Sequence, residues 1–144
     1  MPVRGSALMI FLLGGCVAQD VGPVAPSARF EDPPTRFLEA FEASCIGPAR
    51  EFRELSTGAL ECREFMAPAA TAAAIVEYDG YPQDLPQLVI RFLASEDAPG
   101  YRVDSELFLN VPQRTGLARR IAPSDPRITR QINRLYRAAG GEPM

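Results

Sequence analysis

The segment LVIRFLASEDAPGYRVDSELFLNV, from Leu88 to Val111, carries the strongest fold signal in the chain. Its first part, LVIRFLA, is a largely apolar run, and SEDAPG supplies residues that favour turns. From Tyr101 onward apolar and polar residues alternate, as in a strand with one buried face. Tyr101, Val103, Leu107, Leu109 and Val111 share one face, and Arg102, Asp104, Glu106 and Asn110 share the other. The segment therefore predicts an antiparallel β-hairpin.

Helices are predicted at both ends of the domain. Asp32-Pro33-Pro34 is a helix-start signal, and the helix that follows carries Phe37, Leu38, Phe41 and Cys45 on one side. Asp125-Pro126 starts a C-terminal helix that Gly140-Gly141 ends. Its apolar stripe consists of Ile128, Ile132, Leu135, Tyr136 and Ala139.

Between the first helix and the hairpin the patterns are weaker. Residues 48–55 predict a short helical piece with Phe52 and Leu55 inward, and residues 60–66 and 72–79 predict strands. Together these elements predict an α+β fold: an N-terminal helix, a three- to four-stranded antiparallel sheet, and a C-terminal amphipathic helix packed on one face.

Composition limits the chemistry. The chain has 144 residues, 47% hydrophobic and 23% charged, which fits one globular domain. It contains no histidine, and its fifteen basic residues are all arginine. A Ser-His-Asp triad, a Ser-Lys dyad, a Schiff-base lysine and a histidine-ligated metal are thereby excluded. We expect no enzyme, no cofactor and no metal site. Nucleic acid is not an expected partner of an exported chain with a pI of about 5.0.

The N-terminus has the layout of an export signal. Arg4 precedes the apolar run ALMIFLL of residues 7–13, and Gly14, Gly15 and Cys16 follow. Even extended to Ala18, the apolar stretch is shorter than the roughly 20 residues of a membrane-spanning helix. An ordinary cleaved signal, or a buried strand with an incidental cysteine, is the alternative.

The motif Leu13-Gly14-Gly15-Cys16 resembles the lipobox of bacterial lipoproteins, in which the cysteine becomes the lipidated mature N-terminus. The resemblance covers about the first eighteen residues. It implies a signal peptide over 1–15 and lipidation of Cys16. The prolines and the lack of periodic pattern after Cys16 predict a tether over 16–34, and the helices and strands that follow predict a single domain over 35–141, expected in the periplasm. Because Val17 follows the cysteine, where an Asp tends to retain lipoproteins in the inner membrane, the expected location is the periplasmic face of the outer membrane. The inner membrane is the alternative.

The other two cysteines are expected to pair. Cys45 lies on the apolar face of the first helix, and Cys62 lies on or beside the first strand. Oxidation is expected in an exported protein, so we predict a Cys45–Cys62 disulfide. Two reduced core thiols, or pairing with another chain, are the alternatives.

Charge is distributed unevenly. Residues 114–144 hold seven arginines against two carboxylates, net +5, whereas residues 16–113 are net −9. The C-terminal helix presents Arg127, Arg130, Arg134 and Arg137 opposite its apolar stripe. This face suits anionic headgroups, phosphates or an acidic partner. A solvated helix face is the alternative interpretation.

The acidic residues give weaker indications of a functional site. Glu77, Asp79, Asp104 and Glu106 are expected on polar strand faces as solvent-facing charges, and an acid/base pair is the alternative. The Asp79–Asp84 loop does not match a calcium site. The predicted function is that of a membrane-tethered envelope lipoprotein with a structural, assembly or partner-binding role. Its expected partners are the bilayer, through the acyl chains, and an envelope protein. A periplasmic binding module, as an amphiphile carrier or an enzyme inhibitor, is the alternative.

Overall fold

A computed structural model describes residues 25–123 and 125–144, so Cys16 and the predicted signal peptide lie outside the described residues. The described chain forms seven strands and three helices. In order they are β1 (Ser27–Phe30), α1 (Thr35–Ser44), β2 (Arg50–Glu54), β3 (Leu60–Phe65), α2 (Pro68–Glu77), β4 (Gln87–Asp97), β5 (Gly100–Val111), β6 (Arg119–Ile121), α3 (Pro126–Ala138) and β7 (Glu142–Pro143).

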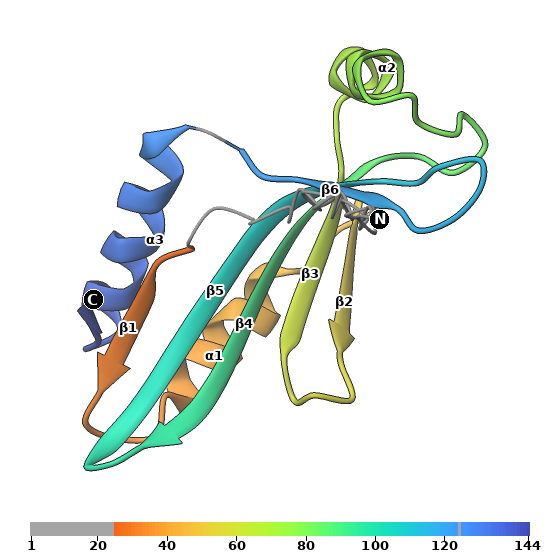
Figure 1. Ribbon diagram of the computed structural model, residues 1–144. Helices are drawn as coiled ribbons and strands as arrows, with labels where there is room; N and C mark the ends of the chain where they lie inside the picture. The colour runs from red at the N-terminus through yellow and green to blue at the C-terminus, as the bar shows by residue number, and fades with distance from the viewer. Residues whose placement is uncertain (1–24, 124) are drawn as a thin grey trace, which may run out of the picture.

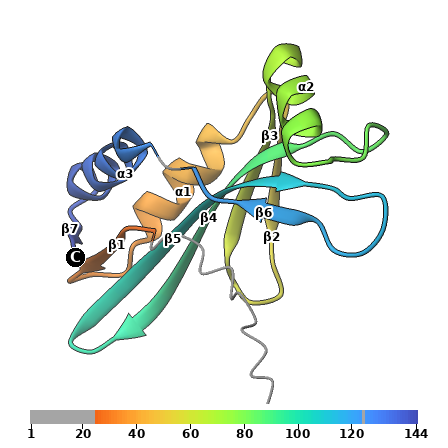
Figure 2. The same ribbon diagram turned by 45° about the horizontal axis from the view of Figure 1, so that its top comes forward.

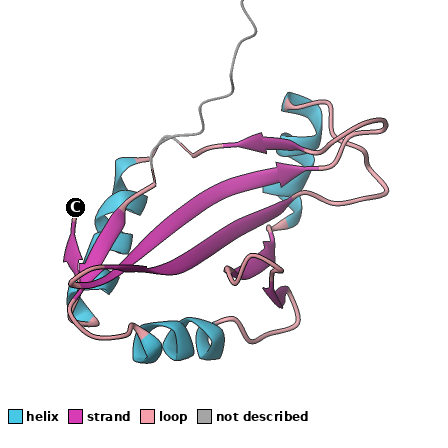
Figure 3. Ribbon diagram, turned by 60° about the horizontal axis from the view of Figure 1, so that its bottom comes forward, coloured by secondary structure: helices cyan, strands magenta, loops and turns pink. Residues whose placement is uncertain are grey.

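The strands form one antiparallel sheet in the order β2-β3-β4-β5-β1-β7 (Figure 1). The β4–β5 hairpin confirms the interpretation of Leu88 to Val111: its register runs from Gln87 opposite Asn110 to Asp97 opposite Gly100. The two strands cross the molecule from end to end (Figure 3). β1 and β6 both pair with β5, at opposite ends of its outer edge.

α1 and α3 pack on the same face of the sheet (Figure 2). Phe37 of α1 and Tyr136 of α3 meet Phe92 of β4 at ring-centroid distances of 4.9 and 6.1 Å. Ala28, Phe30, Val103 and Ile132 complete this core. Gly140 ends α3 with a φ of 86°, a backbone conformation that favours glycine. None of the three helices in the described part of the chain is long and apolar enough to span a bilayer.

Cys45 and Cys62 form a disulfide, with a Cα–Cα distance of 5.8 Å. Cys45 follows the end of α1, and Cys62 lies on β3 with its side chain toward the helices. Both residues are buried, so the bond ties α1 to the sheet from inside the core.

The predicted fold is wrong in the number of strands in the sheet and in the type of its first element. The sheet has seven strands rather than three or four, and a strand, β1, precedes the first helix. β1 lies within residues 16–34, which the sequence predicted as tether. The strand has only four residues, and its pairing partner is β5, far along the chain. Neither length nor local pattern could reveal it.

Two internal elements also differ from prediction. Residues 50–54 form β2 instead of a helix, because Phe52 lies opposite Cys62 on the core face while charged residues flank it. Residues 68–77 form α2 instead of a strand. Alanine is the strongest helix former, and Pro68 suits the first helical turn. The alternation at Val76 to Asp79 is the end of this helix and the turn after it.

Candidate functional site

α3 is built to bury one side and expose the other. The Asp125 carboxylate caps its first turn by accepting a hydrogen bond from the backbone N–H of Arg127, at 2.8 Å. Ile132 and Tyr136 are 3% and 0% exposed and pack into the core. The helix is therefore fixed on the sheet by its apolar side.

The arginine face of α3 consists of Arg127, Arg130, Arg134 and Arg137. At about 100° per residue these positions fall within roughly 80° of the helix circumference, opposite Ile132 and Tyr136. All four residues are exposed. Among the described residues, none of the four makes an ion pair with a carboxylate.

Most arginines of the sheet, unlike those of the arginine face, have carboxylate partners. Arg29 pairs with Asp97 at 2.7 Å, and Arg102 pairs with Asp104 at 2.8 Å. Carboxylate partners are likewise present for Arg50, Arg53, Arg63 and Arg91. Six of the eight sheet arginines thus have a carboxylate partner, and the other two, Arg119 and Arg120 of β6, lie over the rings of Tyr78 and Phe108. The guanidinium groups of the arginine face have neither kind of contact among the described residues and are open to an external anion.

The sheet face away from α1 and α3 holds a buried ion-pair network. Glu61 has no exposed side-chain surface, and its carboxylate accepts from Arg91 Nη2 at 2.6 Å and from Arg63. Arg91 also reaches Glu106 at 2.8 Å. Burial raises the pKa of the Glu61 carboxyl, but hydrogen bonds from Arg91 and Arg63, and their charges, outweigh it and hold the pKa below its ordinary value.

The guanidinium groups of Arg91 and Arg120 stack on the Phe108 ring, 5.4 and 4.8 Å from its centroid. These contacts cover an aromatic ring on the face of the sheet away from α1 and α3. Because the Glu61 carboxylate stays ionised between two arginines and both guanidinium contacts are to an aromatic ring, this cluster stabilises the sheet and offers no group poised to exchange a proton.

The other predicted carboxylates do not converge. Asp104 accepts from Ser27 at 2.6 Å and pairs with Arg102, and Glu106 pairs with Arg91. Glu77 ends α2 and Asp79 follows it, so neither lies on a strand as predicted. Within residues 25–123 and 125–144, no three potential metal ligands gather.

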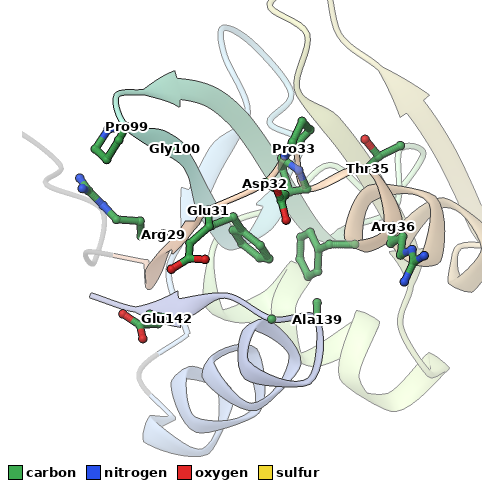
Figure 4. A pocket seen from close by; sticks show the side chains of 14 residues that line it. Arg29, Glu31, Asp32, Pro33, Thr35, Arg36, Pro99, Gly100, Ala139 and Glu142 are labelled. Atoms are coloured by element: carbon green, nitrogen blue, oxygen red, sulfur yellow. The ribbon is translucent and has the colours of Figure 1, made fainter.

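A groove of about 1010 Å³ lies between the β1–α1 connection, Pro99-Gly100 and the end of α3 (Figure 4). Phe30 and Phe37 form its floor, and both rings are already packed in the core. Its walls carry charges of both signs: Arg29, Arg36, Glu31, Asp32 and Glu142. Such walls do not match an acyl chain, so the groove gives no support to the amphiphile-carrier hypothesis.

The chain enters the domain beside α3. Ala25 and Pro26 line a small cavity of about 40 Å³ together with Ile128, Thr129 and Ile132 of the helix. The Tyr136 hydroxyl donates to the Pro26 carbonyl at 3.2 Å. Burial raises the pKa of this phenol to about 12, so the hydroxyl keeps its proton and remains a donor.

Comparisons with protein-family models, curated proteins and solved structures found no match. A function therefore has to be argued from the residues of this chain.

The structure brings together part of the predicted site. It places the four predicted arginines on one exposed helix face, and it joins Cys45 to Cys62. Cys16, the predicted lipidation site, lies outside the described residues. Sequence reasoning missed the Glu61 network and the Pro26–Tyr136 contact, because both depend on strand register and on pairs distant in sequence.

Proposed function

We propose that this protein is a lipid-anchored, non-catalytic component of the bacterial cell envelope that binds an anionic partner through the arginine face of α3. The proposal places it on the periplasmic side of the outer membrane, held by acyl chains on Cys16. The lipobox resemblance of Leu13-Gly14-Gly15-Cys16 supports the anchor.

One observation carries the binding role: four exposed guanidinium groups on one helix face, without carboxylate partners among the described residues. Uncompensated charge of one sign favours association with a surface of the opposite sign. The sheet arginines show that this fold can neutralise a guanidinium where a partner is within reach.

Arginine footprinting in isolated envelopes tests the binding role. A guanidinium-selective reagent is applied to the protein in envelopes and to the purified, lipidated protein in detergent, and modification is quantified by mass spectrometry. The arginine face should react several-fold more slowly in envelopes, because bound anions shield its guanidinium groups. Exposed Arg36 of α1 is the internal reference and should react equally in both. Equal reactivity of the arginine face in both samples would refute the proposal.

A further inference from the structure

We infer that the anionic partner of the arginine face is the layer of anionic phospholipid headgroups of the same membrane leaflet that holds the acyl chains. α3 then lies along the membrane surface. This inference rests on the proposed function, because it requires both the anchor on Cys16 and a ligand for the arginine face.

Chain length limits how far α3 can move from the membrane. Only eight residues, 17–24, separate Cys16 from Ala25. Fully extended, this stretch spans about 30 Å, and as a flexible coil it averages about 17 Å. Ala25 and Pro26 lie against α3 itself, through the cavity with Ile128 and Ile132 and the hydrogen bond from Tyr136. The anchor thus keeps this helix, and not a distant part of the domain, near the headgroups.

The length of α3 is similar to the distance that the tether spans. Its thirteen residues span about 20 Å, comparable to the average reach of the tether. A short tether raises the effective concentration of headgroups around the arginine face, so each arginine–headgroup contact can be weak. Four weak contacts along one helix then suffice to orient the domain.

The distribution of the arginines along α3 favours a headgroup layer as the surface that the helix contacts. The arginine face runs along the whole helix, from the first turn to the last, as contact with a plane requires. Each guanidinium near an anionic membrane raises the ratio of docked to undocked protein about fivefold.

The test uses the full-length, lipidated protein, reconstituted in vesicles of neutral phosphatidylcholine with or without anionic phosphatidylglycerol. The chain contains no tryptophan, so Gln131→Trp introduces a unique fluorescent reporter at an exposed position one turn from both Arg127 and Arg134. Leu93→Trp is the control, because Leu93 lies on the face of the sheet away from α1 and α3 and is 37% exposed. Brominated lipids quench an indole that reaches the headgroup region.

Quenching of the Gln131→Trp reporter should rise at least about threefold on anionic over neutral vesicles and fall again at about 0.5 M salt. The Leu93→Trp reporter should show no such increase. Changing all four arginines of the face to Gln should abolish the increase, whereas changing all four to Lys should retain it. The Lys variant separates the two kinds of partner, because a headgroup layer attracts any cation, whereas a protein carboxylate prefers the bidentate hydrogen bonds of a guanidinium group. Circular dichroism verifies that each variant is folded.

The outcomes separate this inference from the proposed function. Equal quenching on both kinds of vesicle, or an unchanged increase in the Gln variant, overturns the inference. If the arginine face is nevertheless shielded in envelopes, its partner is an envelope protein and the proposed function stands. If it is shielded in neither system, both are refuted.

Discussion

Glu61 shows how one residue depends on the register of three strands. Its side chain is fully buried on the face of the sheet away from α1 and α3, where Arg63 and Arg91 both bind its carboxylate. Glu61 lies opposite Arg91, and Arg91 lies opposite Glu106, so β3, β4 and β5 are joined by one row of alternating charges. Burying a carboxylate is tolerated here because two cations satisfy it.

We predict that Glu61→Gln lowers the free energy of unfolding by about 2–4 kcal/mol at neutral pH, because two partly buried guanidinium groups lose their shared anion. The pKa of Glu61 is lowered in the folded state. Its contribution is therefore complete above the ordinary value of about 4.3 and is lost as the pH falls through the lower folded value. Urea titrations across this range measure the difference between variant and wild type.

Glu51→Gln is the control, because Glu51 and Arg53 form an exposed pair on the neighbouring strand. Its free energy of unfolding should equal that of the wild type within error. A Glu61→Gln deficit that stays constant from neutral to acidic pH would contradict the assignment of a lowered pKa.

At the scale of elements, the helices and strands that could be predicted from the sequence are those with a clear amphipathic pattern. The β4–β5 hairpin, α1 and α3 were recognisable because each has one clear apolar face that the core uses. α2 was not, because it extends beyond the end of the sheet (Figure 1) and its exposed surface includes Val76, 84% exposed. β1, β6 and β7 are two to four residues long and exist through partners distant in sequence.

The same reasoning explains which part of the site was predictable. The arginine face follows from helical spacing alone, so the sequence revealed it. The contact between Pro26 and Tyr136 joins residues 110 positions apart and needs the complete fold.

The disulfide connects two of these elements, α1 and β3, across seventeen positions of sequence. Replacing both Cys45 and Cys62 by Ser should lower the free energy of unfolding by about 3 kcal/mol, because the unfolded chain regains the entropy of a loop of this length. Urea unfolding under non-reducing conditions provides the measurement. Cys16→Ser makes the same chemical change outside the domain and should leave the value unchanged. A free-thiol count of two on unfolded, unreduced mature protein would disprove the bond.

At the scale of the whole molecule, the proposed function makes acylation of Cys16 the determinant of membrane attachment. We predict that labelled palmitate is incorporated into the wild-type protein and lost in Cys16→Ser, since this thiol is the expected acceptor. Acyl chains contribute about 0.8 kcal/mol per buried CH₂, so the variant should move from the membrane to the soluble fraction. The Cys45→Ser, Cys62→Ser protein should keep its label. Label that persists in Cys16→Ser would exclude the lipobox assignment.

The position of β1 sets the order in which the sheet can be completed. Ser27 pairs with Asp104, 77 positions later, and the backbone N–H of Met144 donates to the Ser27 carbonyl at 2.9 Å. In a chain that emerges N-terminus first, β1 cannot enter the sheet until β5 has followed, and its other edge stays open until β7 follows. If the chain is exported and acylated as proposed, processing at Cys16 can act before the first strand is fixed in the sheet.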